Sequence, residues 1–136
     1  MTDTATGGKI TSTKEIDNRI ISQLRTEWET ENLVASGSAP VVKKYNDPVR
    51  DKELARRGAL LDAQRNLAAK VSTIRLTATV IMSDLMATDF AQSRLDAVLQ
   101  DVTVLAETFN EEAQRWDVTV QMPKVKLLKV VEEVNH

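Results

Sequence analysis

The chain has 136 residues, of which 42% are hydrophobic and 28% are charged, and its formal net charge is −2. These values are typical of a soluble globular domain, and a chain of this length can fold without a metal or a disulfide. The absence of cysteine excludes disulfides and thiolate chemistry, and the lack of net positive charge argues against general nucleic-acid binding.

Targeting signals are missing from the sequence. No apolar run approaches the length of about 18 residues that a transmembrane helix needs. The N-terminal residues lack the basic and apolar regions of a signal peptide. We therefore expect either a mature envelope protein whose signal has been removed, or a cytoplasmic protein.

The N-terminal part is predicted to be a tether followed by a helix. Residues 1–12 are rich in Thr, Gly and Ser, which is typical of a disordered tether. Ser12 and Glu15 have capping-box spacing, so an amphipathic helix is expected over about 13–28, within an N-terminal region of residues 13–32. Its apolar face comprises Ile16, Ile20, Leu24 and Trp28. This face either packs on the chain's own domain or docks a partner.

Residues 33–41 read as a first strand, which opens a predicted domain over residues 33–123. Gly37 inside the strand indicates a bulge or a close approach of another backbone. Pro40 ends the strand or confines it to a sheet edge.

The segment from Asp47 to Met82 is predicted to be a long helix followed by a strand. Asp47 is a good N-cap, and Pro48 suits the first helical position, so the helix is expected over 48–71. One apolar stripe consists of Leu60, Ala63, Leu67 and Val71, and a second consists of Leu54, Leu61 and Ala68. From Ile74 to Met82 apolar residues alternate with period two, which predicts a strand at 73–82.

The last third is predicted to hold a short helix and a hairpin. Asp89 and Gln92 have the spacing of an N-cap and its third residue, which favours a helix over 89–100. Two strands at 102–109 and 115–122 are joined by a short polar turn and should form an antiparallel hairpin.

The tail, residues 124–136, fits either a short helix or a strand. The whole order predicts an α+β fold, with a mostly antiparallel sheet packed on one long helix and an extra N-terminal helix.

The inventory of catalytic side chains is nearly empty. His136 is the only histidine and is the last residue, so it is not expected to act as a base or a ligand. Phosphate-binding glycine motifs are absent. Acidic residues gather around the hairpin, namely Glu107, Glu111, Glu112 and Asp117, and read as a solvated turn. We predict no catalytic residue, no cofactor and no metal site.

Two polar features of the sequence are candidate surfaces. The basic residues Lys43, Lys44, Arg50, Lys52, Arg56 and Arg57 form either a solvated helix face or a contact for an anionic surface. Arg65 and Asn66 are polar residues in the middle of the long helix, and they are predicted to be a structural polar pair. Asn66 is expected to bond a neighbouring strand or loop.

A family resemblance rests on the helix motif Ala55-Arg56-x-x-Ala59-Leu60-x-Asp62-Ala63-x-Arg65-Asn66-Leu67, together with Ala35-x-Gly37, Ile74-x-Leu76 and Trp116-x-Val118-x-Val120. On these residues, 33–122 resembles the bacterial LPP-type outer-membrane lipoproteins and the N-terminal domain of the flagellar assembly protein T. The resemblance implies a dodecin-like β-α-β-α-β-β domain in a non-enzymatic envelope or flagellar accessory protein. The lipid-attachment cysteine is missing, and the last hairpin lacks the glycine that family members often carry.

We therefore expect a non-enzymatic structural or protein-interaction module of the bacterial cell envelope, associated with the flagellum, the periplasm or the outer membrane. Expected partners are proteins, including further copies of the chain, and membrane association would require an anchor that this chain lacks. The expected interaction surface comprises Ile16, Ile20, Leu24, Trp28, Leu54 and Leu61. The alternative is a soluble domain that binds a small ligand between helix and sheet, where Arg65, Asn66 and Thr77 or Thr79 would supply polar groups.

Overall fold

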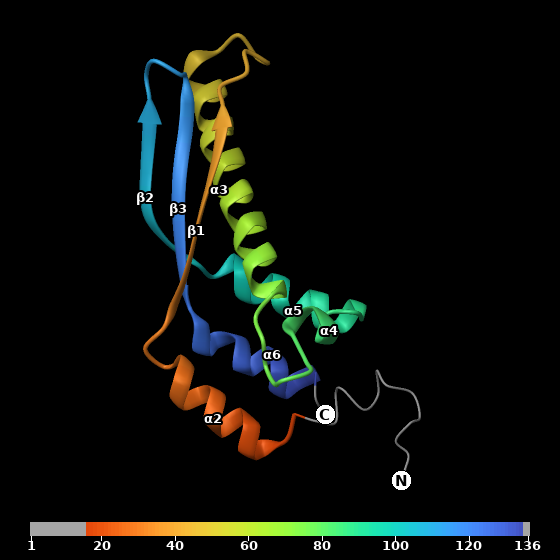
Figure 1. Ribbon diagram of the computed structural model, residues 1–136. Coiled ribbons are helices and arrows are strands. Elements are labelled where there is room, and N and C mark those ends of the chain that lie inside the picture. Colours follow the sequence, from red (N-terminus) through yellow and green to blue (C-terminus); the bar gives the residue numbers. More distant parts are fainter. Residues whose placement is uncertain (1–15, 135–136) are drawn as a thin grey trace. The chain divides into compact units, whose positions relative to one another are not determined.

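The computed structural model describes residues 16–134. The predicted tether, the predicted capping box of Ser12 and Glu15, and His136 lie outside the described residues. The elements are α2 (Asn18–Trp28), β1 (Asn32–Pro40), α3 (Pro48–Ser72), α4 (Met82–Leu85), α5 (Asp89–Gln100), β2 (Thr103–Asn110), β3 (Arg115–Pro123), η1 (Lys124–Lys126) and α6 (Leu127–Val134) (Figure 1). The predicted α+β class is confirmed.

The chain divides into two compact units. The sheet unit consists of residues 33–69 and 99–122, and it holds the strands and most of α3. The helical unit consists of the described residues before 33, residues 70–98 and the described residues from 123 onward.

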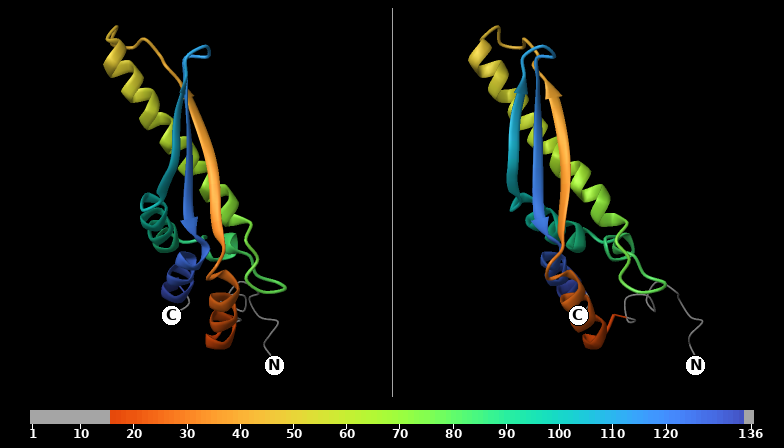
Figure 2. Two further views of the ribbon diagram at one scale, coloured as in Figure 1. Left: turned by 90° about the vertical axis from the view of Figure 1, so that its left-hand side faces the viewer. Right: turned by 60° about the vertical axis from the view of Figure 1, so that its left-hand side comes forward.

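The sheet unit contains a three-stranded sheet in the order β1-β3-β2. The predicted hairpin is confirmed: β2 and β3 pair antiparallel, with Glu107 opposite Val118 and Phe109 opposite Trp116. Val118 and Val120 of the central strand are fully buried. Helix α3 runs along one face of the sheet (Figure 2). Trp116, which lies on the same side of β3 as these two valines, donates to the Lys52 carbonyl of α3 at 2.9 Å, so Val118 and Val120 face the helix.

Helix α3 begins where the sequence predicts. The Asp47 carboxylate accepts hydrogen bonds from the amides of Val49 and Arg50 at 3.2 and 3.3 Å, as an N-cap does. Its buried stripe is made mostly of small residues, namely Ala55, Ala59, Ala63, Leu67 and Val71. The expected burial of Leu67 is confirmed, whereas Leu60 is only half-buried.

The small residues of α3 allow the helix backbone to touch β1. A Cβ atom added to Gly37 would lie 2.1 Å from the Ala63 amide nitrogen and 2.6 Å from the Asp62 carbonyl carbon. The predicted close approach at Gly37 is therefore confirmed, and no larger residue fits there without a backbone shift.

The predicted strand at 73–82 is wrong. These residues form a loop with one isolated bridge between Arg75 and Ile81, and α4 begins at Met82. The Thr77 hydroxyl accepts hydrogen bonds from the amides of Thr79 and Val80 at 3.2 and 3.1 Å. Local hydrogen bonds of this kind compete with strand pairing. The element order therefore lacks the second strand that the dodecin-like arrangement requires.

The helical unit begins with α2, whose N-cap is Asp17 and not Ser12. The Asp17 carboxylate accepts from the amides of Arg19 and Ile20, both at 3.0 Å. The predicted start near residue 13 is wrong, because Ile16 and Asp17 precede the helix. Ile16 and Ile21 are buried and occupy the two positions of a hydrophobic staple.

Residues 124–134, the described part of the tail, are helical, which decides in favour of the helix between the two alternatives that the sequence leaves open. Its apolar residues Leu127, Leu128, Val130 and Val131 are buried. Helix α2 packs against η1 and α6. Arg25 forms an ion pair of 3.1 Å with Glu132.

Helix α5 spans the predicted residues, but its cap lies one residue earlier than expected. The Thr88 hydroxyl accepts from the amide of Ala91 at 3.1 Å. Asp89 is the first helical residue, where its carboxylate still interacts favourably with the positive end of the helix dipole.

Candidate interaction surface

The six residues predicted to form one interaction surface belong to two different units. In the helical unit, Leu24 and Trp28 are 5% and 3% exposed, Ile16 is fully buried, and Ile20 is half-buried. Their apolar face thus packs within this unit, where the Lys124 ammonium also lies 5.0 Å from the Trp28 ring centroid. In the sheet unit, Leu54 and Leu61 are 40% and 60% exposed on the outer side of α3.

The predicted polar pair of Arg65 and Asn66 does not act together. The Asn66 amide donates to the Ser36 carbonyl of β1 at 2.7 Å, which confirms the prediction that Asn66 bonds a neighbouring strand. Arg65 is exposed and lies 3.5 Å from the Asp62 carboxylate. Arg65 therefore contributes a surface ion pair, which is worth little.

The outer edge of β1 is covered by side chains of α3. One turn before Asn66, the Asp62 carboxylate accepts a hydrogen bond from the Ser38 amide at 3.0 Å. Residues four apart lie on the same helix face, so Asp62 and Asn66 supply an acceptor and a donor to alternate residues of the strand. A strand that offers its edge groups to a helix in this way is protected from pairing with another chain.

The outer edge of β2 is open. Among residues 16–134, β2 pairs only with β3. Its residues are exposed from Thr103 to Thr108, including Val104 and Leu105 at 41% and 50%. The strand contains no Lys, Arg or Pro, the residues that commonly block an edge. An exposed edge of this kind is a template for an extended partner.

A bulge divides β2 into two parts. Val104 lies opposite Val120 and Ala106 lies opposite Thr119, so Leu105 is an extra residue. Residues 106–110 form the longer regular run. Because opposite residues share a face, Glu107 and Phe109 lie on the helix side with Val118, and Thr108 lies on the other side with Asp117.

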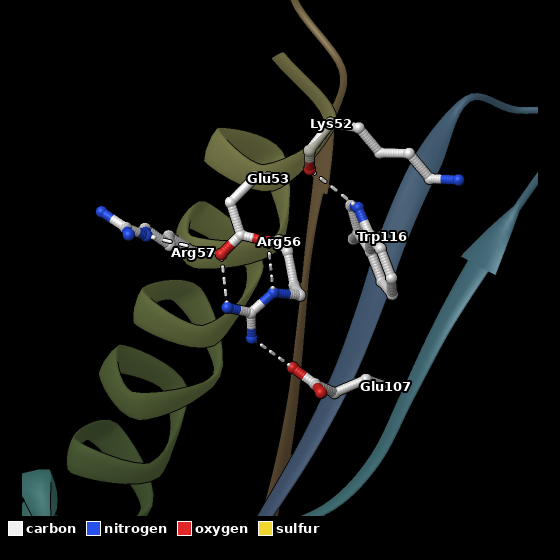
Figure 3. A network of polar contacts seen from close by, with 6 residues as sticks. All are labelled: Lys52, Glu53, Arg56, Arg57, Glu107 and Trp116. Atoms are coloured by element: carbon white, nitrogen blue, oxygen red, sulfur yellow. Dashed lines mark hydrogen bonds and ion pairs between the residues drawn. The ribbon is translucent and has the colours of Figure 1, made fainter. Parts of the chain in front are cut away.

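An ion-pair network joins β2 to α3 (Figure 3). Arg56 donates to Glu53 at 3.0 Å and to Glu107 at 2.8 Å. The hydrogen bond from Arg56 lowers the pKa of the Glu53 carboxyl below its ordinary value of 4.5, against a smaller opposing effect of desolvation. The bonds to Glu53 and Glu107 raise the pKa of the Arg56 guanidinium. The only charge on β2 is thus neutralised within the chain.

The predicted basic cluster separates into two groups. Arg56 and Arg57 form ion pairs with Glu53. The Lys52 ammonium instead lies 4.1 Å from the centroid of the Phe109 ring, and the Arg50 guanidinium lies 3.8 Å from the centroid of the Tyr45 ring. These cation–π contacts place the second group beside aromatic rings at the N-terminal end of α3.

A pocket of about 260 Å³ lies at this end of the sheet unit, lined by Lys43, Lys52 and Glu111 among others. The buried Asp51 carboxylate accepts from the amides of Tyr45 and Asp47 at 3.1 and 3.3 Å. The Asp47 carboxylate in turn accepts hydrogen bonds from the amides of Val49 and Arg50 in the first turn of α3. The carboxylates at this helix end hold the 41–47 loop in place, so their role is structural.

The acidic residues of the hairpin have separate surroundings. Glu107 binds Arg56 and Asp117 binds Arg115, at 2.8 and 3.0 Å, while Glu111 and Glu112 are exposed. The described part of the chain contains no cluster of three or more His, Cys, Asp or Glu side chains arranged for a metal ion. Of the helices in residues 16–134, none is both long and apolar enough to cross a membrane.

In comparisons with known proteins, no protein-family model and no curated protein sequence matches this chain. The resemblance to LPP-type lipoproteins and to the flagellar assembly protein T therefore stays a prediction from the helix motif.

The sequence patterns alone do not predict that the edge of β2 is open. One signal was available: the predicted strand at 102–109 contains Val104, Leu105 and a single charge. Strand order, however, decides whether such a strand is central or at an edge, and local sequence patterns do not predict strand order.

Proposed function

We propose that this chain is a non-enzymatic structural or protein-interaction module of the bacterial cell envelope, and that it binds protein partners through the edge of β2. The observation that carries the proposal is the contrast between an edge covered by Asp62 and Asn66 and an edge with exposed Val104 and Leu105. The envelope, and a flagellar association within it, come from the resemblance of the α3 motif.

A small-ligand site between helix and sheet is not favoured by the geometry. Gly37 lies against the backbone of Ala63, and Asn66, a predicted ligand group, is hydrogen-bonded to Ser36. The contacts between α3 and β1 therefore fill this part of the interface and leave no room there for a ligand.

The test is site-specific photo-cross-linking in the native cell. A photoreactive amino acid at Thr108 of β2 should give protein adducts of discrete mass, identified by mass spectrometry. The matched control places the same amino acid at Ser38 of β1, an exposed position on the covered edge, and should give none. Absence of adducts from Thr108, or equal adducts from both positions, would overturn the proposal.

A further inference from the structure

We infer that the edge of β2 pairs antiparallel with β2 of a second copy of this chain, about a two-fold axis at Thr108. The inference rests on the proposed function and names its partner. It starts from the exposed hydrogen-bonding groups of the open edge, which another extended backbone can pair in register.

Electrostatics favours a neutral partner strand. Glu107 is the only charged residue between Thr103 and Asn110, and Arg56 of the same chain binds it at 2.8 Å. The edge therefore offers no net charge with which to select an acidic or a basic segment. Another β2 strand, with its own Glu107 neutralised in the same way, meets this requirement.

Symmetry restricts the register. A two-fold axis perpendicular to the sheet keeps each side chain on its own face, and directly opposite residues share a face. The axis must therefore lie midway between one residue and the same residue of the second copy. The bulge at Leu105 limits regular pairing to residues 106–110, and the centre of this run is Thr108.

Charge supports the same register. An axis at Glu107 would place two carboxylates directly opposite each other, which is unfavourable. An axis at Thr108 places Thr108 opposite Thr108 of the second copy, a pairing that permits a cross-strand hydrogen bond. It also places Glu107 opposite Phe109 of the second copy, on the face where both lie.

The interface is small. Pairing of five residues buries less than the roughly 800 Å² per partner of a standard stable complex, so the dimer should dissociate in the micromolar range. Light scattering over a concentration series should show a monomer–dimer equilibrium. A wild-type chain that stays monomeric at high micromolar concentration would overturn the inference.

Charge substitutions test the axis. Thr108→Lys places two ammonium groups opposite each other and should raise the dissociation constant about tenfold. Thr103→Lys, the same change on the same strand outside the regular run, should leave it unchanged. An equimolar mixture of Thr108→Lys and Thr108→Glu should restore the dimer, and only folded chains can do so. Self-association that Thr108→Lys does not weaken would assign it to another surface and overturn the inference.

Single cysteines test the register directly, because the chain has no cysteine of its own. Under mild oxidation, Thr108→Cys should form a disulfide-linked dimer, since directly opposite Cβ atoms lie about 4.5–5.5 Å apart, a small adjustment from the roughly 3.5–4.5 Å of a disulfide. Ala106→Cys, opposite Asn110 of the second copy, should form much less. Equal disulfide yields at both positions would contradict an axis at Thr108.

The cross-linking experiment separates this inference from the proposed function. An adduct from Thr108 with twice the mass of the chain supports both. An adduct with a different protein, while the purified chain stays monomeric, would overturn the second copy as partner and leave the interaction module standing.

Discussion

The two edge strands of the sheet, β1 and β2, differ in the contacts that they receive from α3. On β1, α3 supplies hydrogen bonds to the backbone through Asp62 and Asn66, and its own backbone touches Gly37. On β2, α3 contacts side chains instead, through the ion pair from Arg56 to Glu107 and the Lys52 ammonium 4.1 Å from the Phe109 ring centroid. A hydrogen bond to a charged group contributes about 1.5–3 kcal/mol, whereas a surface ion pair contributes about 0–1 kcal/mol. Helix α3 thus occupies backbone groups at the edge of β1, whereas on β2 it contacts side chains and leaves the backbone edge open.

The largest expected effect comes from separating β1 from α3. Gly37→Ala would place a Cβ atom 2.1 Å from a backbone nitrogen, and such overpacking should cost about 3 kcal/mol in the free energy of unfolding. The matched control is Gly58→Ala, whose Cβ would meet only the Ala39 Cβ at 3.3 Å and whose helical position favours alanine. Urea unfolding should show a large loss for the first variant and little change for the second. Equal losses would contradict the close contact.

The next effect comes from uncovering the edge of β1. The double variant Asp62→Ala with Asn66→Ala leaves the Ser38 amide and the Ser36 carbonyl without these partners, and it should cost about 2–3 kcal/mol. Hydrogen exchange of the Ser38 amide should accelerate. Arg65→Ala, which removes only the surface ion pair with Asp62, is the control and should leave that amide protected. An unchanged Ser38 exchange rate in the double variant would show that the edge is closed by other means.

A smaller effect is expected where α3 meets β2. Arg56→Gln removes the ion pairs to Glu53 and Glu107 and should cost about 0.5–1 kcal/mol at low salt, with the difference shrinking at high salt. Arg57→Gln removes one longer and more exposed pair and should have almost no effect. A loss for Arg56→Gln that is independent of salt would mean that packing of the side chain, and not its charge, is responsible.

The smallest effect is a pH dependence. The pKa of Glu53 is lowered in the folded chain, so its ionised form stabilises the fold above the ordinary value of 4.5, and this contribution is lost as pH falls through the lowered pKa. Wild type should therefore be slightly more stable than Glu53→Gln near neutral pH. The difference in melting temperature should vanish under acid conditions. A difference that grows as pH falls would contradict the assigned direction.

Local signals allowed prediction of the parts of the fold that depend on neighbouring residues. Asp47 and Pro48 marked the start of α3, Gly37 marked the backbone contact, and the polar turn after Asn110 marked the hairpin. The predicted strand at 73–82 is absent because the alternation reflects burial of Leu76 and Val80 in a loop and of Met82 at the start of α4. The Thr77 hydroxyl accepts hydrogen bonds from two amides of that loop. These local bonds compete with strand pairing, and the period of the apolar residues gives no sign of them.

The interaction surface could be predicted only in part, for a related reason. The apolar face of α2 was recognised, but the burial of Leu24 and Trp28 depends on packing against η1 and α6. The covering of β1 by Asp62 and the exposure of β2 both follow from the strand order β1-β3-β2. That order is set by contacts between residues far apart in the chain.

Each unit holds one of the two tryptophans of the chain. Trp28 is buried in the helical unit, while Trp116 is half-buried in the sheet unit and donates to the Lys52 carbonyl at 2.9 Å. Replacing either one by phenylalanine leaves a single indole whose emission reports on one unit alone. The chain therefore carries its own pair of optical probes. Coincident denaturation curves from the two would identify cooperative unfolding of the whole chain, and separated curves would give each unit a stability of its own.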